Sequence, residues 1–410
     1  MTSSYSTASS GTCSADIVIF GGGVAGLWLL NRLRNEGYQA ILFEKDALGG
    51  GQTIASQGII HGGLKYALSG ALSGAANAIA DMPARWRSCL QGEGDVDLRG
   101  CGLLSDHYFM WSDAGIRSKL KTFFGSKSLR GRVESVATDQ YPEFYAQATV
   151  KGALYRLPDF VVDTPSLLSV LSDNQKAFIY KIKPDSVSFD RNDAGNIDTV
   201  TVDHQGESTR IKTQRLVFCA GEGNEQLITK AQLRSVKTQT RPLKMVYLKG
   251  QGLPSVYVHC IGDNFSLTPK LTVTSHVDAD GATVWYLGGE LAESGVERSD
   301  DQQITAARAL LAELFPWIDL SGTHWQCFTI NRAEANIKNN YRPDDAFYIE
   351  EDNVITAWPT KLTLSPSLAD KLVEHLSANT VKPRPPANTD GLDELRARLT
   401  YPSIAAAHWD

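Results

Sequence analysis

Three glycines and one glutamate near the N-terminus have the types and the spacing that bind the pyrophosphate and ribose of a dinucleotide. Gly21, Gly23 and Gly26 form a G-x-G-x-x-G pattern within the run GGGVAG, and Glu44 ends the next apolar run. Gly21 permits a tight turn, Gly23 lets the backbone approach the phosphates, and Gly26 lets a helix pack closely on a strand. Glu44 is placed to accept hydrogen bonds from ribose hydroxyls.

The elements needed to position these residues follow one another in the expected order. Residues 17–20 form a short apolar run, which is typical of a parallel strand buried on both faces. Residues 24–35 carry leucines at helical spacing, Gly37 is placed to end this helix, and residues 40–43 form a second buried strand. The start of the helix would present N–H groups and a positive dipole end to a phosphate. The alternative interpretation is a strand-to-helix turn that binds no ligand.

The glycine pattern alone fits NAD or FAD, and the segment that follows favours FAD. A glycine-rich loop, GGGQTIASQGIIHGGLKYALSG, covers residues 49–70, where a simple NAD dehydrogenase continues into alternating strands and helices. Such a loop can lay backbone N–H groups against phosphates and a flat ring. A second dinucleotide pattern, GEGNEQ at residues 221–226, has Gln226 in place of its third glycine. We therefore expect no separate nicotinamide site.

Three blocks of the chain carry a resemblance to a known family. They are the loop SQGIIHGGLKY, the segment RLVFCAGEGNEQL and the C-terminal block YRPDDAFYIEEDNVITAWPTKLTLSPSLADKL. Together they resemble the D-amino acid oxidase-like superfamily of FAD-dependent oxidoreductases, which includes glycine oxidase, the FAD-linked glycerol-3-phosphate dehydrogenases and the L-2-hydroxyglutarate dehydrogenases. The resemblance implies an α/β FAD-binding lobe that is Rossmann-like, of the glutathione-reductase-like type. It also implies an α+β substrate lobe with a mainly antiparallel sheet.

FAD is the cofactor that the resemblance implies. The residues that it places against FAD are Gly21, Gly23, Val24, Ala25, Gly26, Glu44, Lys45, Ser56, Gln57, Gly58, His61, Gly62, Cys219, Ala220, Gly221, Thr360, Lys361 and Leu362. One block departs from the family pattern, because the turn over the flavin pyrimidine edge usually carries several glycines and reads WPTKLTL at residues 358–364. Lys361 has two interpretations there, as a positive charge near the ring or as a solvent-facing side chain. The start of the following helix would stabilise negative charge on the reduced ring.

Histidines and arginines are the candidates for chemistry on a substrate. His61 has three interpretations: a base, a covalent attachment point for the flavin, or a structural residue bonded to backbone. The other candidate bases are His259, His276 and His324. Arg332 and Arg342 have the fork that suits a substrate carboxylate or phosphate, and an ion pair that fixes the loop is the competing interpretation.

These features predict an FAD-dependent oxidase or dehydrogenase. Its substrate would be a small amine, amino acid or 2-hydroxy acid, oxidised by hydride transfer to flavin N5. We expect the substrate to bind between the flavin and the second lobe, and electrons to leave to oxygen, a quinone or another carrier. Two alternatives stay open: a flavin monooxygenase acting on a larger substrate, and a non-catalytic FAD-binding protein.

The element pattern predicts a discontinuous FAD-binding domain. The expected parts are a disordered tail at 1–14, FAD-binding segments at 15–90, 151–235 and 328–380, substrate-domain segments at 91–150 and 236–327, and a C-terminal extension at 381–410. Residues 64–90 favour helix, with a break or a new start at Pro83. Asp163 is expected to cap a helix whose first turn holds Pro165. Asp280-Gly281 predicts a hairpin between two strands.

Composition argues against several classes of function. The 410 residues carry a net charge of −6 and no basic block, so we expect no nucleic-acid partner. No run approaches the roughly 20 apolar residues of a transmembrane helix. The six cysteines include no C-x-x-C pair, so we expect no metal site, and this usage fits a reducing cytoplasm.

Overall fold

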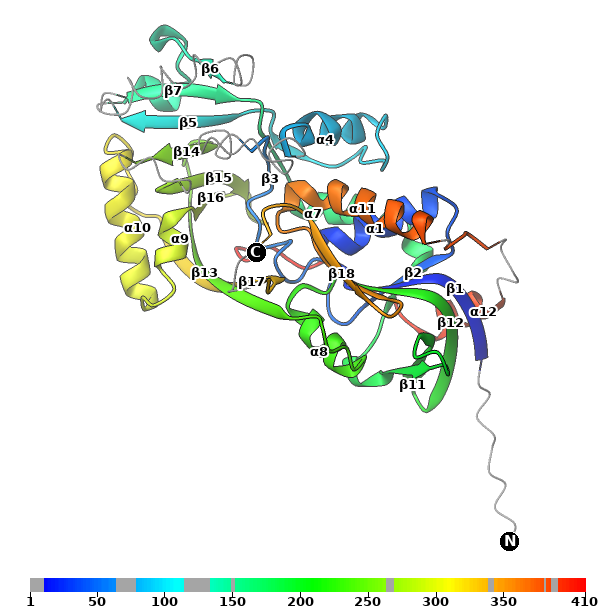
Figure 1. Cartoon of the computed structure of the whole chain (residues 1–410). Helices are drawn as coiled ribbons and strands as arrows, with labels where there is room; N and C mark the ends of the chain where they lie inside the picture. The colour runs from blue at the N-terminus through cyan, green and yellow to red at the C-terminus, as the bar shows by residue number, and fades with distance from the viewer. Residues whose placement is uncertain are drawn as a thin grey trace.

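The computed structural model describes residues 11–63, 79–113, 133–148, 152–262, 269–337, 343–379, 381–384 and 390–410. In this part of the chain the strands form two eight-stranded sheets and one three-stranded sheet. Figure 1 shows two lobes, each built on one of the large sheets. We call the lobe with the N-terminal strand the first lobe and the other the second lobe.

The sheet of the first lobe has a parallel centre. Its parallel strands, in spatial order, are β9 (Ile179–Lys181), β2 (Ala40–Glu44), β1 (Gly11–Phe20), β12 (Glu207–Phe218) and β19 (Val354–Trp358). Ile17 and Ile19 of β1 point into one core and Val18 and Phe20 into a second. The uninterrupted apolar run therefore reflects a strand that is buried on both faces.

Antiparallel strands extend this sheet. On one side β11 (Ile197–His204) pairs with the start of β12, and β10 (Val187–Arg191) pairs with β11 at the edge of the sheet. On the other side β18 (Phe347–Glu351) pairs with β19. β1 begins at Gly11 rather than at residue 15, where the ordered chain was expected to start. Residues 11–14 pair with 209–212 of β12, and this ladder orders them.

Helices pack on both faces of this sheet. Those of one core are α1 (Val24–Asn35), α4 (Met82–Gln91), α7 (Thr164–Asp173) and α11 (Ser365–Ala378), and those of the other are α8 (Asn224–Lys230) and α12 (Asp390–Arg398). The predicted helix 24–35 is confirmed, and Gly37 follows its end with φ +86°. Asp163 caps α7 by accepting a hydrogen bond from the Ser166 amide. Most of the helix expected over 64–90 lies outside the described residues, and α4 has Pro83 in its first turn.

The sheet of the second lobe is antiparallel except where β14 meets β5. In spatial order its strands are β17 (His324–Ala335), β13 (Thr238–Gly250), β16 (Thr283–Gly288), β15 (Leu271–Val277), β14 (Val258–Ile261), β5 (Tyr108–Asp113), β7 (Gly152–Leu157) and β6 (Glu134–Ser135). The hairpin predicted at Asp280-Gly281 joins β15 to β16, and Gly281 has φ +81°.

The two faces of this second sheet meet different partners. One face packs on α6 (Glu143–Ala146), α9 (Glu290–Ser294) and α10 (Asp300–Leu314). The opposite face carries Thr272, Thr274 and Tyr286, which contact residues 55–57 of the first lobe. The face of β15 and β16 that carries these three residues is therefore directed toward the first lobe.

A small sheet lies between the two lobes. Its strands are β3 (Ile59–Ile60), β8 (Phe160–Val162) and β4 (Leu103–Ser105). β8 pairs with both others and leads directly into α7 of the first lobe. The domain boundary expected at residue 328 falls inside β17, which continues to Ala335 beside β13.

Candidate functional site

In the turn between β1 and α1 the backbone packs closely against the backbone of residues 219–220. Gly21 has φ +111°, and its amide donates to the carbonyl of Phe43 at 2.8 Å. A Cβ at Gly21 would lie 2.6 Å from the backbone of Cys219 and Ala220, and one at Gly26 would collide with the carbonyl oxygen of Gly21. Side chains at these two positions would therefore push apart the segments that form the turn.

The start of α1 leaves backbone N–H groups for an anion. The Val24 amide donates to the Thr53 hydroxyl at 3.1 Å, and Thr53 is buried. Within the described residues, the amides of Ala25 and Gly26 donate no hydrogen bond. Because these amides also stand at the positive end of the helix dipole, the turn suits a phosphate or pyrophosphate.

The Glu44 carboxylate lies beside the same turn. It accepts hydrogen bonds from the amides of Gly22 at 2.6 Å, Lys45 at 2.8 Å and Asp46 at 2.9 Å. These bonds orient the carboxylate at the end of β2, next to the glycine turn. This is the place where a ribose attached to the pyrophosphate would meet it.

The segment after β12 forms the opposite wall of the turn. The Cys219 amide donates to the carbonyl of Phe20 at 2.8 Å, and the Ala220 amide donates to the side-chain oxygen of Asn224 at 2.8 Å. Burial raises the pKa of the Cys219 thiol to about 12, so this thiol stays protonated and is not a nucleophile. Its role here is to be small and buried.

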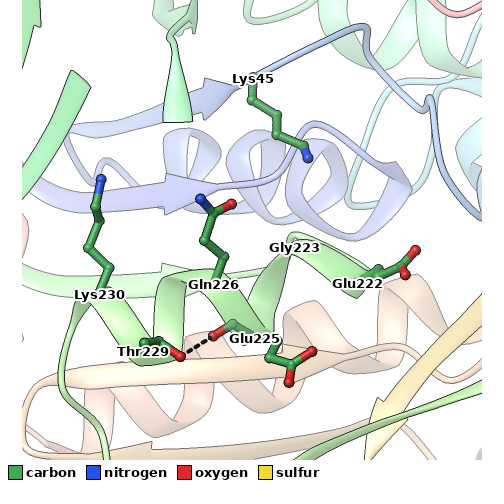
Figure 2. Close-up of a pocket in the computed structure, with 7 residues that line it drawn as sticks. All are labelled: Lys45, Glu222, Gly223, Glu225, Gln226, Thr229 and Lys230. Carbon is green, nitrogen blue, oxygen red and sulfur yellow. Dashed lines mark hydrogen bonds between the residues drawn. The ribbon is translucent and has the colours of Figure 1, made fainter. Parts of the chain in front are cut away.

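A cavity of about 750 Å³ lies between the end of β2 and helix α8. Figure 2 shows Lys45, just after the end of β2, pointing toward α8, and Gln226 and Lys230 pointing back from the helix. The residues that line the cavity are Lys45, Glu222, Gly223, Glu225, Gln226, Thr229 and Lys230. It adjoins Glu44 through Lys45, so it lies next to the position where a ribose would meet that carboxylate.

The loop of residues 56–62 runs from this turn toward the second lobe. Gly58 has φ +69°, and a Cβ there would collide with the carbonyl oxygen of Val162. The Gln57 amide reaches into the second sheet, where its Nε2 donates to the Tyr286 carbonyl at 2.9 Å and its Oε1 accepts from Thr272 at 2.6 Å. In this structure Gln57 therefore joins the two lobes.

The end of that loop is held from two sides. The His61 carbonyl accepts a hydrogen bond from the Thr363 hydroxyl at 3.3 Å, and the Gly62 amide donates to Asp159 at 2.9 Å. Asp159 is 3% exposed, and burial raises the pKa of its carboxyl to about 7. Sequence reasoning missed Asp159, because a Pro-Asp pair between two strands reads as a simple turn. Only its contact with Gly62 connects it to the site.

The turn of residues 358–364 brings the start of α11 next to the loop of residues 56–62. Thr360 has φ +61°, a conformation that glycine adopts more readily, which agrees with the glycines usual in the family at this turn. Leu362 opens a short 3₁₀ helix, Leu362–Leu364, that runs into α11. The Lys361 ammonium donates to the carbonyl of Asp344 at 2.9 Å.

The candidate bases have different surroundings. His276 is 5% exposed beside Trp409, and burial lowers its pKa to about 3, so its ring is neutral. His324 is exposed and contacts Gln326, while the His259 ring lies 4.4 Å from that of Tyr108.

The two candidate arginines also differ. Arg332 forms an ion pair with Glu293 at 3.2 Å, and burial, together with Arg241, lowers the pKa of its guanidinium. This geometry agrees with the interpretation of Arg332 as a residue that fixes the chain. Arg342 lies outside the described residues.

In the described part of the chain, no group of three or more His, Cys, Asp or Glu side chains is arranged to hold a metal ion. Within the same residues, no helix combines the length and apolar character needed to cross a membrane.

Comparison with known proteins places this geometry in a family. Residues 16–374 match the family model of the FAD-dependent oxidoreductases named DAO. A probable FAD-dependent oxidoreductase of Pseudomonas aeruginosa is 43% identical over 401 residues, which cover 97% of this chain and 98% of that protein. A crystal structure of an FAD-dependent oxidoreductase from Pseudomonas aeruginosa aligns with a TM-score of 0.83 at 37% identity, over 98% of this chain and 99% of that one.

More distant structures share the fold. Glycine oxidase from Geobacillus kaustophilus has a TM-score of 0.65 at 15% identity and covers 93% of this chain and 98% of its own. L-alpha-glycerophosphate oxidase from Mycoplasma pneumoniae, solved with FAD bound, has a TM-score of 0.63 at 15% identity over 89% and 95%. The bare helix amides and the glycine turn fit the FAD pyrophosphate that these relatives imply. The chain belongs to the D-amino acid oxidase-like family of FAD-dependent oxidoreductases.

Proposed function

We propose that this enzyme oxidises a small amine, amino acid or 2-hydroxy acid by hydride transfer to flavin N5, as an oxidase or a dehydrogenase. The observation that carries the proposal is the glycine turn with its bare helix amides, in a chain that matches the FAD-dependent oxidoreductase family over residues 16–374. Beside this turn the two lobes meet closely, because the buried hydroxyls of Thr272 and Thr274 lie 2.6 and 3.5 Å from the Gln57 amide group. Such a close approach of the lobes favours a small substrate over a large one.

The names of structural neighbours support the same substrate class. They include iminodiacetate oxidase from Chelativorans sp. BNC1, L-proline dehydrogenase from P. horikoshii and glycine oxidase. Each of these proteins is named for an amine or amino acid. The glycerophosphate oxidase is named for a phosphorylated alcohol, so a hydroxy compound stays within the proposal.

The protein side of the reaction is positioning and proton transfer. When bound, FAD supplies the hydride acceptor at N5. His61 is our proposed base, because the bonds at its carbonyl and at the Gly62 amide fix the backbone from which its imidazole extends. Arg342 is our proposed partner for a substrate carboxylate, since Arg332 already pairs with Glu293.

The remaining FAD contacts are proposals of the same kind. Glu44 and Lys45 would hold the adenosine half, and the start of α11 near Thr360 would stabilise charge on the pyrimidine edge of the flavin. Oxygen, a quinone or a protein carrier would accept the electrons. The Rossmann-like character of the first lobe accords with the βαβ order of β1, α1 and β2.

Anaerobic reduction of the purified yellow protein tests the substrate class. We expect one or more members of a panel of amines, amino acids and 2-hydroxy acids to bleach the flavin absorbance. Bleaching by NADPH and by no panel member would support a flavin monooxygenase instead. A flavin that is inert to every donor and to sulfite would support a non-catalytic FAD-binding protein.

Matched variants test the proposed residues. His61→Asn is expected to slow flavin reduction, while His324→Asn, at an exposed position, leaves it unchanged. Arg342→Lys should raise KM for an acidic substrate more than Arg332→Lys does. Retention of the flavin by the denatured protein would instead identify a covalent attachment, and its loss from His61→Asn would place that bond at His61.

A further inference from the structure

The last eleven residues cross from the first lobe to the second. This C-terminal segment (residues 400–410) follows α12, which packs beside β1, and the Lys181 amide at the end of β9 donates to the Thr400 carbonyl at 2.7 Å. Figure 1 shows α12 beside β1 and β12, whereas the chain end, marked C, lies between the two lobes. The segment therefore runs from one lobe to the other and passes near the glycine turn between β1 and α1.

On its way the C-terminal segment binds the loop that follows β2. The Leu48 amide donates to the Ser403 carbonyl at 2.8 Å, and the Ala405 amide donates to the Leu48 carbonyl at 3.0 Å. The next residue of the loop, Gly49, donates to the carbonyl of Gly22 at 2.9 Å. Two consecutive residues thus connect the C-terminal segment to the glycine turn.

Farther along, Trp409 packs on the face of the second sheet that looks toward the first lobe. It is 6% exposed, and its ring centroid lies 4.5 Å from His276, 5.2 Å from Tyr286 and 6.2 Å from Tyr247. His408 stacks on Phe328 at 3.6 Å. The C-terminal segment therefore covers this aromatic group from the side of the first lobe.

Tyr286 connects Trp409 to the loop of residues 55–57. Its hydroxyl donates to the Ala55 carbonyl at 2.8 Å, and its own carbonyl accepts from Gln57 at 2.9 Å. A shift of the Tyr286 ring would therefore move the backbone of residues 55–57, which precedes Gly58. The Trp409 ring is one of the contacts that prevent this shift.

The chain end itself is fastened to the second lobe. The Lys249 ammonium donates to the Trp409 carbonyl at 3.1 Å and pairs with Asp278 at 2.9 Å. The Ala279 amide donates to the Asp410 side chain at 3.0 Å. These bonds hold the last two residues at the turn between β15 and β16.

We propose that the C-terminal segment is part of the cofactor site, and that Trp409 is a positioning residue that holds residues 48–57 in the geometry that binds FAD. The loop is held at Leu48 by backbone bonds and at Ala55 and Gln57 through Tyr286. Both anchors depend on the same segment of chain. Loss of Trp409 removes the ring that packs on Tyr286 and so loosens the loop at Ala55, while Gln57 keeps its bond to Thr272; a displacement of about one ångström at Ala55 is enough to weaken binding.

The test compares two tryptophans of equal burial on opposite faces of one sheet. Trp325 is 7% exposed and belongs to the core on the α10 side, so it is the matched control for Trp409. The measurements are the FAD dissociation constant of the full-length apoprotein, from quenching of flavin fluorescence, and the visible circular dichroism of the bound flavin. We expect Trp409→Ala to raise the dissociation constant about tenfold and to alter the flavin spectrum. Trp325→Ala should lower the melting temperature and leave both flavin readouts unchanged.

A milder variant protects the test against misfolding. Tyr286→Phe keeps the ring that packs on Trp409 and removes only the bond to Ala55, so we expect it to weaken FAD binding in a folded protein. The double variant should bind FAD about as weakly as Trp409→Ala, because both changes release the same loop. Unchanged FAD affinity in both single variants would overturn the proposal. An equal loss of affinity in Trp325→Ala and Trp409→Ala would also overturn it, as the sign of general destabilisation.

Discussion

Replacing Gly21 by alanine should have two separate effects, a loss of folding stability and a loss of FAD affinity. The new Cβ would lie 2.6 Å from the backbone of Cys219 and Ala220, whereas carbon atoms in contact stay roughly 3.5 Å apart or more. The two segments must therefore separate by about 1 Å. The alanine must also adopt φ +111°, which costs about 1–2 kcal/mol in folding.

The separation should reduce FAD affinity, because both segments are expected to contact the dinucleotide. A charge-assisted hydrogen bond stabilises by about 1.5–3 kcal/mol, and its useful range of distance is only about 0.5 Å wide. Loss of one phosphate contact thus predicts a dissociation constant raised at least about tenfold. The assay is titration of the apoprotein with FAD, followed by quenching of flavin fluorescence.

Gly252→Ala is the matched control. Gly252 has φ +81° and no other atom within 4 Å of its Cβ position, so this variant reproduces the backbone strain without the collision. We expect both variants to lose stability, Gly21→Ala the more because it adds the collision to the backbone strain, and only Gly21→Ala to lose FAD affinity. If Gly21→Ala bound FAD as tightly as the wild type, the glycine turn would not be the phosphate site.

Three further changes follow from the geometry of the site. Burial raises the pKa of Asp159 from 3.8 to about 7, so the folded state holds a proton that the unfolded state releases, and stability falls as pH rises from about 4 to about 7. Asp159→Asn keeps an acceptor for the Gly62 amide and does not ionise. In urea denaturation we therefore expect its free energy of unfolding to exceed that of the wild type by up to about 4 kcal/mol at pH 8 and to equal it near pH 4. Thr53→Val leaves the Val24 amide without its acceptor, and we expect a loss of about 1–3 kcal/mol in the same assay; an unchanged midpoint would contradict this cap. Thr360→Gly removes the strain of φ +61° and should raise the free energy of unfolding by about 1 kcal/mol in thermal unfolding. A lower melting temperature would show that the contacts of the Thr360 side chain stabilise the fold by more than the strained backbone destabilises it.

Short-range rules account for what could be predicted. Strand 17–20, the glycine turn, helix 24–35 and the caps at Gly37 and Asp163 each depend on residues close in sequence, and the structure has them where they were expected. The hairpin at residues 280–281 is another case of the same kind. Turn and cap preferences act over a few residues, so they can be read without knowing the fold.

Other features depend on pairings between distant parts of the chain. The start of β1 at Gly11 follows from the ladder with residues 209–212, which no local preference reveals. The resemblance placed Gln57 against FAD, and no local pattern reveals that its amide group also meets Thr272 and Tyr286 across more than 200 residues of sequence. Asp159 acquires its raised pKa only from burial in the folded chain, which outweighs the opposing effect of the hydrogen bond from the Gly62 amide.

The amino-acid sequence by itself determined that a dinucleotide binds, because a pyrophosphate site needs only a strand, three glycines and a helix start in succession, and the later glycine-rich loop favoured FAD over NAD. It also determined the helix and strand types of most local elements. Only the tertiary structure decided which side chains join the lobes and which hold the loop beside the glycine turn. The reason is that Gln57, Asp159 and Trp409 acquire their roles from contacts that exist only after the two sheets have packed together.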